Sequence, residues 1–240
     1  MIFLQTAVYA HRGASAAFRE NTVEAFRGAA AMGADWVELD VRRTADGGLA
    51  VHHDAHLADG RAIVETLATE LPASLPSLAS ALEACAPLGV NVEIKNWPDD
   101  IDFDPEARIA ESVARAIEGR VQPIIVSSFH APTLERVRAI GPGVPTAQLT
   151  FLLKDPDRAI EAALAAGHVA LHPHDGTVTP HLVELAHARG LALNVWTVDD
   201  PERIRELAEM GVDGIVTNVP DVALAALGRG GRRPSDSTKE

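Results

Sequence analysis

The feature that most constrains the fold is a regular alternation of apolar runs and amphipathic stretches along the whole chain. The apolar runs begin near residues 6, 35, 90, 123, 144, 168, 191 and 213, and most segments between them carry apolar residues at helical spacing. Short β-branched runs are typical of strands, and apolar residues spaced three and four apart are typical of helices. Strands that alternate with helices predict a parallel sheet covered by helices.

The number of units favours one architecture. Eight strand–helix units in 240 residues fit a (β/α)8 TIM barrel, which commonly needs about 250 residues. An extra strand at residues 49–53 is expected to pair locally with the second barrel strand across the turn Asp46-Gly47-Gly48. A doubly wound open sheet is the main alternative. No Gly-x-Gly-x-x-Gly follows the first strand, which disfavours a dinucleotide-binding version of that fold.

No domain boundary interrupts this pattern, so a single barrel domain is predicted over residues 1–227. Residues 55–75 are polar and mixed in character, with Pro72 near their end and Pro76 just after it, and we expect a loop with little regular structure there. The tail, residues 228–240, is polar and rich in glycine and is predicted to be disordered.

Charge and composition narrow the classes of function. The formal net charge is −13, whereas a nucleic-acid-binding protein usually presents a basic face, so we expect no nucleic-acid partner. An acidic chain binds an anionic substrate only where a metal or local Arg and Lys reverse the field. No window approaches about 20 uninterrupted apolar residues, and Met1–Ala10 does not read as a signal peptide, so no stable membrane insertion is predicted.

The single cysteine, Cys85, excludes an intrachain disulfide. It lies in an apolar helical pattern and is expected to be packed. This composition is compatible with a reducing compartment, and we expect a cytoplasmic location.

Paired carboxylates occur in the run Val37-Glu38-Leu39-Asp40-Val41, and Glu38 and Asp40 are expected to end the second barrel strand. On a strand Glu38 and Asp40 point the same way, and two like charges on one face are costly unless a cation lies between them. A divalent metal with oxygen ligands would supply that cation. Taken alone, the pair also fits an ordinary solvent-facing strand. Glu93 and Lys95 repeat the same spacing near the end of the third barrel strand.

Other polar side chains also follow strands rather than precede them, as expected for a barrel whose active site lies at the C-terminal ends of its strands. His11 and Arg12 close the first strand, and His53 ends the locally paired one, on the same face as Val51. Later strand ends carry Ser127, Ser128, Phe129, His172, Trp196, Thr217 and Asn218.

Together these segments resemble the ordered motifs of the glycerophosphodiester phosphodiesterases, from about residue 7 to residue 227. The matching motifs are His11-Arg12-Gly13, Glu20-Asn21-Thr22, Glu38-x-Asp40-Val41, Val51-His52-His53-Asp54, Val92-Glu93-Ile94-Lys95, Ser128-Phe129, Trp196-Thr197-Val198 and Gly211 to Asn218. Two features depart from the family pattern. Arg19 stands where the family usually has proline, and residues 55–75 lack the family's Asp-Arg-Thr-Thr-like run.

The resemblance implies roles for eight residues, which are listed here by role. Glu38, Asp40 and Glu93 would bind one divalent cation, Mg²⁺ or Ca²⁺; His11 and His53 would be general acid and base; Arg12 and Lys95 would hold the phosphate, and Trp196 would face the glycerol. A packed core position is the alternative for Trp196, and Phe129 and His172 are further candidates to line the pocket.

The implied activity is metal-dependent hydrolysis of small glycerophosphodiesters to sn-glycerol 3-phosphate and an alcohol. Two alternatives stay open at this point. One is a lysophospholipase D-like phosphodiesterase acting on longer lipids, for which residues 55–75 offer little apolar material. The other is a non-catalytic barrel that binds phosphate compounds. The preferred head group and the oligomeric state are also open.

Overall fold

The computed structural model describes residues 5–230. Its strands are β1 (Ala7–His11), β2 (Trp36–Arg43), β3 (Leu49–Val51), β4 (Gly89–Ile94), β5 (Ile124–Ser128), β6 (Thr146–Thr150), β7 (Ala170–Pro173), β8 (Ala192–Val195) and β9 (Gly214–Thr217). Its helices are α1 (Val23–Met32), α2 (Leu78–Cys85), α3 (Arg108–Ile117), α4 (Ala131–Ile140), α5 (Pro156–Ala165), α6 (Pro180–Ala188), α7 (Pro201–Met210) and α8 (Pro220–Ala226).

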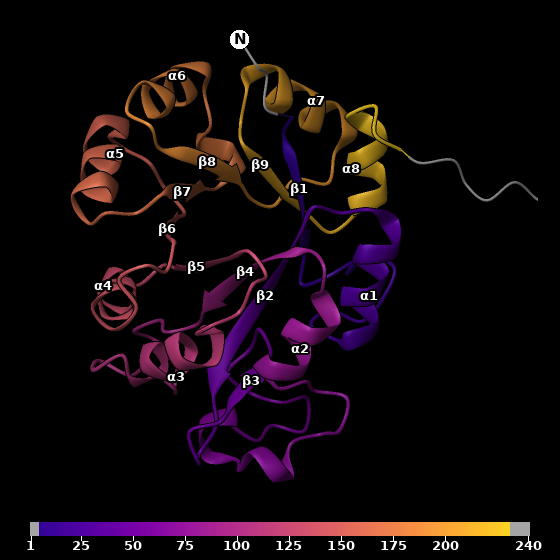
Figure 1. Ribbon diagram of the computed structural model, residues 1–240, viewed down its shortest axis with the longest axis vertical. Coiled ribbons are helices and arrows are strands. Elements are labelled where there is room, and N and C mark those ends of the chain that lie inside the picture. The colour runs from indigo at the N-terminus through magenta and orange to yellow at the C-terminus, as the bar shows by residue number, and fades with distance from the viewer. Residues whose placement is uncertain (1–4, 231–240) are drawn as a thin grey trace, which may run out of the picture.

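Eight strands form a closed parallel barrel with the helices around it (Figure 1). The sheet order is β1-β9-β8-β7-β6-β5-β4-β2, and parallel pairing of β1 with β2 closes the ring. β3 pairs antiparallel with β2 outside the ring. The (β/α)8 prediction is therefore confirmed, together with the extra strand after the second barrel strand.

The helix ends follow local sequence signals. The side chain of Thr22 accepts a hydrogen bond from Ala25 N at the start of α1, and Asp200 does the same for α7. Gly33 and Gly211 end these two helices with φ near 90°, a left-handed conformation that other residues adopt only with strain. These helix ends keep the connections from α1 to β2 and from α7 to β9 short, which fixes where those strands begin.

The main core lies between the barrel wall and the helices. Its largest fully buried side chains include Phe26, Leu39, Leu78, Leu82, Ile94, Leu134, Ile160, Leu171, Leu182, Leu191 and Leu193. Cys85 packs in this core with no exposed surface, as predicted, and burial raises the pKa of its thiol to about 12. Cys85 is therefore a packing residue rather than a reactive thiol.

The inside of the barrel is filled at its N-terminal end. Tyr9 and Trp36 stack there with ring centroids 5.2 Å apart. Gly89 and Gly214 leave room for these rings, because a Cβ atom at either position would lie within 2.6 Å of a Trp36 or a Tyr9 ring atom. Ile125, Ala147 and Ala170 pack with Trp36 and help to fill this end of the barrel, whereas active sites in this fold lie at the C-terminal ends of the strands.

Residues 55–75 contain only two single 3-10 turns, Ile63–Glu65 and Ala68–Glu70, which agrees with the predicted loop. Ile63 and Leu57 are nevertheless buried and pack with Ala50 of β3. The predicted disordered tail lies outside the described residues from position 231 onward.

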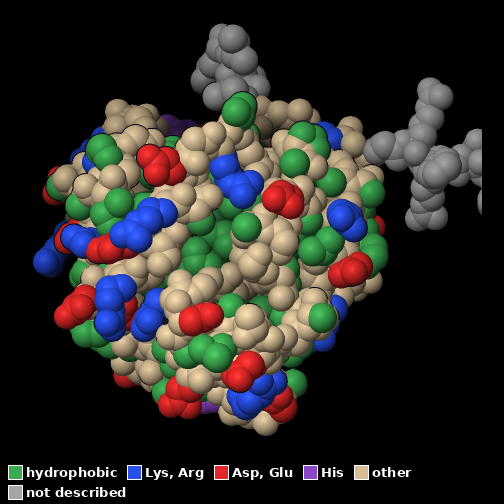
Figure 2. Space-filling model, turned by 60° about the horizontal axis from the view of Figure 1, so that its bottom comes forward, with side chains coloured by type: hydrophobic (Ala, Val, Ile, Leu, Met, Phe, Trp, Pro, Cys, Tyr) green, Lys and Arg blue, Asp and Glu red, His purple; other side chains and the backbone are tan. Residues whose placement is uncertain are grey.

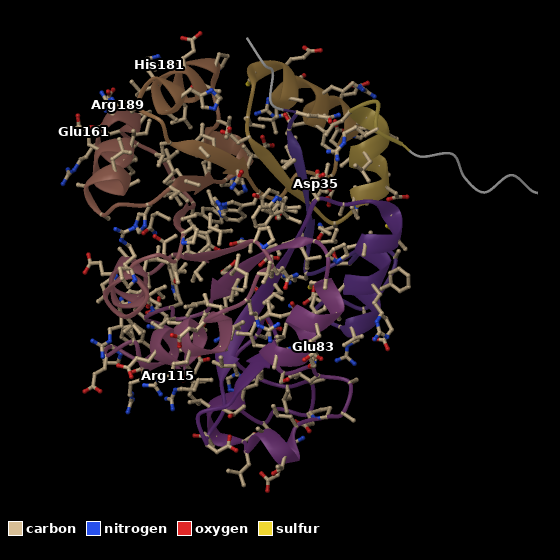
Figure 3. All side chains as sticks on the ribbon, in the orientation of Figure 1. Asp35, Glu83, Arg115, Glu161, His181 and Arg189 are labelled. Atoms are coloured by element: carbon tan, nitrogen blue, oxygen red, sulfur yellow. The ribbon has the colours of Figure 1, made fainter. Side chains whose placement is uncertain are left out.

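The surface is acidic and mixed. On the face shown in Figure 2, Lys and Arg side chains lie among Asp and Glu rather than in a continuous basic area. Glu83, Arg115, Glu161, His181 and Arg189 lie on the outer helical layer (Figure 3). Within residues 5–230, none of the helices combines the length and apolar character needed to cross a membrane.

Candidate active site

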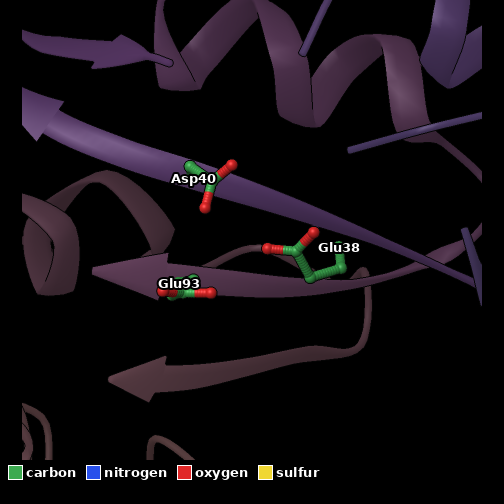
Figure 4. Close-up of side chains that lie close together, drawn as sticks. All are labelled: Glu38, Asp40 and Glu93. Carbon is green, nitrogen blue, oxygen red and sulfur yellow. The ribbon is translucent and has the colours of Figure 1, made fainter. Parts of the chain in front are cut away.

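The three carboxylates predicted to bind a metal lie side by side on β2 and β4. Asp40 is in register with Glu93, and Glu38 is in register with His11 at the end of β1. An oxygen from each carboxylate lies within 4.8 Å of the others, and all three residues are buried (Figure 4). Buried like charges this close require compensating cations.

One detail of the prediction is wrong: Glu38 and Asp40 do not end their strand. β2 continues to Arg43, because its last residues pair with β3. The neighbouring strands stop earlier, β1 at His11 and β4 at Ile94. The carboxylates therefore lie level with the C-terminal rim of the barrel although their own strand runs on.

Two cationic side chains compensate Asp40. Lys95 Nζ lies 3.0 Å from Asp40 Oδ1 and 2.6 Å from Glu93 Oε1, and Arg12 Nε lies 3.2 Å from Asp40 Oδ2. Burial acts to raise the pKa of Asp40, but Lys95 and Arg12 outweigh it and hold that pKa below its ordinary value. Asp40 is thus ionised and held in place by two cations.

Glu38 is compensated less well. Its Oε2 accepts a hydrogen bond from Arg12 N at 3.0 Å, but its buried Oε1 has no partner among the described residues. Burial, then the charges of Asp40 and Glu93, raise the pKa of Glu38 well above its ordinary value. Burial also raises the pKa of Glu93, with Lys95 opposing it. Three carboxylates, of which the buried oxygens Glu38 Oε1 and Asp40 Oδ1 lack a hydrogen-bond partner among the described residues, form a donor set that fits a hard divalent cation.

Arg12 and Asn21 orient these carboxylates, and both residues adopt an uncommon backbone conformation. Both residues have positive φ, 56° and 55°. This conformation directs Arg12 N to Glu38, while Asn21 Nδ2 donates to Asp40 Oδ2 at 2.8 Å and Asn21 Oδ1 accepts from Asp40 N at 3.3 Å. A left-handed conformation in a non-glycine residue is strained and persists only where the surroundings require it.

The His11 ring is fixed by a hydrogen bond at its Nδ1 atom. Its Nδ1 lies 2.7 Å from Asn218 Oδ1, and Asn218 Nδ2 donates to Asp199 Oδ2 at 2.7 Å. The Asn218 oxygen is therefore the acceptor, so His11 carries its proton on Nδ1 and presents Nε2 as an acceptor. His11 Nε2 lies 3.9 Å from Glu38 Oε2.

His53 is held in a similar way, but beyond its strand. β3 ends at Val51, and His53 Nδ1 lies 2.7 Å from Asp54 Oδ1. Arg42 Nε donates to the His53 carbonyl at 2.7 Å. Because a carboxylate can only accept, the neutral ring again bears its proton on Nδ1 and leaves Nε2 free.

A cavity of about 870 Å³ connects these groups. Seven of the eight predicted site residues line it: His11, Arg12, Glu38, His53, Glu93, Lys95 and Trp196. Asp40 is the exception, because it lies behind Arg12 and Lys95 with 1% of its surface exposed. Phe129 and His172 also line the cavity, as predicted.

Comparison with known proteins identifies the family. The family model described as the glycerophosphoryl diester phosphodiesterase family matches residues 11–222. The chain belongs to this family. The resemblance seen in the motifs is confirmed, and the chemistry common to the family is hydrolysis of a glycerophosphodiester.

Curated relatives extend over nearly the full chain. A glycerophosphodiester phosphodiesterase of Caldanaerobacter subterraneus subsp. tengcongensis is 32% identical over 95% of this chain and 100% of its own length. A glycerophosphodiester phosphodiesterase of Bacillus altitudinis is also 32% identical, over 91% of this chain and 97% of its own.

Solved structures of similar proteins have the same fold. A putative glycerophosphoryl diester phosphodiesterase from Silicibacter pomeroyi superposes with a TM-score of 0.82 at 29% identity, covering 94% of this chain and 95% of its own. An Oleispira antarctica phosphodiesterase, solved with the product sn-glycerol-3-phosphate, has a TM-score of 0.85 at 23% identity, covering 93% and 97%.

Four residues that contact the predicted site residues were not assigned site roles in the sequence analysis. Asn21 and Asn218 lie in the motifs that match the family, and that position was the sequence signal that could have identified them. Asp54 directly follows His53. Arg42 carried a weaker signal, because it continues the series Glu38, Asp40 on one strand face.

Proposed function

We propose that this family member hydrolyses glycerophosphodiesters to sn-glycerol 3-phosphate and an alcohol, with a divalent cation, Mg²⁺ or Ca²⁺, and histidine acid/base catalysis. The observation that carries the proposal is the position of His11 and His53. Each has its Nδ1 fixed by a neighbour, and both line the same cavity as Glu38 and Glu93 of the carboxylate cluster.

Glu38, Asp40 and Glu93 would hold the cation. When bound, it would neutralise charge on the phosphate oxygens and polarise the phosphorus centre. Lys95 and Arg12 add fixed positive charge beside it, which favours a phosphodiester anion in an otherwise acidic protein.

The two histidines would then move the protons. A neutral imidazole accepts a proton at Nε2 from the attacking hydroxyl, either water or a hydroxyl of the substrate, as the new P–O bond forms. The other, protonated imidazole donates to the leaving alkoxide as the old P–O bond breaks. The reaction consumes one water overall, and Trp196 would present its ring to the glycerol.

A coupled assay for glycerol 3-phosphate release tests the activity. Glycerophosphocholine and glycerophosphoethanolamine are supplied as substrates with Mg²⁺, with Ca²⁺ or with EDTA. We expect turnover with a metal and its loss in EDTA. Absence of turnover on every diester with either metal rejects the proposal and leaves the non-catalytic binding barrel.

Single variants test the roles. His11→Ala and His53→Ala should each lower kcat by about 10²- to 10⁴-fold while metal binding, followed by calorimetry, is largely kept. His181→Ala is the matched control, because His181 lies on the outer surface of α6 (Figure 3). Near-wild-type rates in either active-site histidine variant would refute the acid/base assignment.

A further inference from the structure

The cavity has a second half that supplies no charged or acid/base group to the proposed cleavage, and of its residues only Trp196 has a role there, facing the glycerol. Its charged half comes from β1, β2, β4 and the segment after β3. Across from it stands a series of aromatic rings, here called the aromatic wall: Trp97, Phe129, Trp196 and Phe151. These rings follow β4, β5, β8 and β6, so strand ends build both halves.

The aromatic wall is continuous and partly rigid. Centroid distances are 5.7 Å from Trp97 to Phe129, 5.5 Å from Phe129 to Trp196 and 5.7 Å from Trp196 to Phe151. Trp196 Nε1 donates to the His172 carbonyl at 2.8 Å, which fixes the central ring. Such edge and face contacts hold rings in place at low entropy cost.

The outer end of the wall is exposed to solvent. Trp97, Phe151 and the cavity-lining Ile101 are 47%, 59% and 54% exposed. Three large apolar side chains gathered at the mouth of one cavity differ from scattered surface residues, because clustered exposed apolar surface marks a binding site. If the alcohol esterified to the phosphate were small and polar, this apolar surface would stay exposed to water.

The charge at the mouth restricts the occupant further. Asp99 and Asp100 lie between Trp97 and Ile101 and also line the cavity. Arg42 pairs with Asp100 at 3.0 Å, whereas no ion pair joins Asp99 to another described residue. A chain that ends in a second anionic group would be repelled here.

We propose that the aromatic wall and Ile101 bind an apolar chain without further negative charge, carried on one of the two alcohols of the phosphodiester. The preferred substrates would then be amphiphilic phosphodiesters of the lysophospholipid kind. This inference rests on the proposed phosphodiesterase activity. The apolar material comes from the loops after β4 and β6 rather than from residues 55–75, where the sequence offered little.

A chain-length series tests the inference on the purified protein. kcat/KM is measured for the ethyl, butyl and octyl esters of glycerol 3-phosphate, all below their aggregation concentrations. Burial of each methylene is worth up to about fourfold, so we expect the octyl ester to exceed the ethyl ester by at least about tenfold. A 1-octyl-glycerophosphocholine arm shows whether the chain is accepted on the glycerol side instead.

Exposed residues provide the variants, because their replacement leaves the core intact. Trp97→Ser and Phe151→Ser should each reduce the octyl-to-ethyl ratio of kcat/KM by about threefold or more. Val121→Ser, which changes a fully exposed residue before β5, should leave the ratio unchanged.

Three outcomes contradict the inference. One is an octyl-to-ethyl ratio near one in wild-type protein, with no gain for 1-octyl-glycerophosphocholine either. The second is a ratio that the Trp97 and Phe151 variants leave unchanged. The third is a preference for glycerophosphocholine over its neutral 3,3-dimethylbutyl analogue without any chain-length effect, which would make the rings a cation site. In each of these cases, turnover of the ethyl ester would still support the proposed phosphodiesterase activity. Absence of turnover on every diester would instead reject that activity itself.

Discussion

Arg42 and Asp102 form a buried ion pair in which Arg42 Nη1 lies 2.7 Å from both carboxylate oxygens of Asp102. The same guanidinium donates to Asp100 at 3.0 Å and to the His53 carbonyl at 2.7 Å. Arg42 therefore joins the end of β2, the segment that carries His53 and the loop that carries Trp97. Through these contacts the Arg42 side chain connects the segment of His53, a proposed acid/base residue, to the loop of Trp97 in the aromatic wall.

Replacement of Asp102 by Asn should destabilise the protein and misplace His53. Loss of the Asp102 charge leaves the buried Arg42 with the partly exposed Asp100 as its remaining ion-pair partner among the described residues, and costs up to about 3 kcal/mol, measured as the free energy of unfolding in urea. We also expect kcat to fall about tenfold. Arg115→Met is the control, because Arg115 is 73% exposed and its pair with Glu111 is worth under about 1 kcal/mol. Equal stability of the Asp102 and Arg115 variants would contradict a stabilising role of the Arg42–Asp102 pair.

Metal binding should stabilise the protein through Glu38. At a concentration about 100 times its Kd, a cation adds about 2.7 kcal/mol, which raises Tm by about 5 °C in a chain of this size. Glu38→Gln should lose this rise in Tm but remain at least as stable as wild type in EDTA, because it removes a buried like charge beside Asp40 and Glu93. Differential scanning calorimetry with Mg²⁺, Ca²⁺ or EDTA measures both effects.

Glu83→Gln on the outer face of α2 is the control for this experiment and should keep the full metal-induced rise (Figure 3). An unchanged Tm of wild type across all three conditions, at saturating metal, would argue against a cation at the carboxylate cluster.

The two histidines differ in how strongly their orientation is enforced. His11 is 17% exposed and bonds to Asn218, which Asp199 fixes in turn, whereas His53 is 35% exposed and bonds to an Asp54 side chain that is 74% exposed. Solvent weakens the second interaction. Asn218→Ala should therefore lower kcat by about 10²-fold, and Asp54→Ala by about tenfold or less. Steady-state kinetics at constant metal compares the two, and the reverse order would contradict this account.

The fold was predictable because its signals are local. Period-two apolar runs, helical spacing and helix-ending residues such as Gly33 each act within a few residues. The same parity predicted that Glu38 and Asp40 share a face, and the resemblance to a family with ordered motifs supplied their proposed partners.

The groups that position the site were less predictable because they act across the sequence. Arg42 and Asp102 are 60 residues apart, and His11 and Asn218 meet only because the barrel closes, 207 residues apart. His53 lies beyond the end of β3, so strand parity does not place it; the Arg42 hydrogen bond contributes to its position. The aromatic wall likewise joins four strand ends that no local pattern connects.

His172 should make stability depend on pH below neutrality. It lies inside the barrel, where burial lowers its pKa to about 3, and its Nε2 lies 2.8 Å from Asn194 Nδ2. Below pH 6.5 the unfolded chain takes up a proton that the folded protein refuses until about pH 3, so this group's contribution to stability is present at neutral pH and falls as pH is lowered. The loss amounts to about 2 kcal/mol between pH 6.5 and pH 5.

His172→Gln isolates this effect, because glutamine has an acceptor for the Asn194 amide but takes up no proton. Urea unfolding at pH 7, 6 and 5 should give a steeper loss of stability for wild type than for the variant. The buried carboxylates Glu38 and Glu93 have raised pKa values and act with the opposite sign, but they contribute equally to both proteins and cancel in the difference. If the stability of the two proteins fell equally with pH, the pKa of His172 would not differ between the folded and unfolded states, and this account would be wrong.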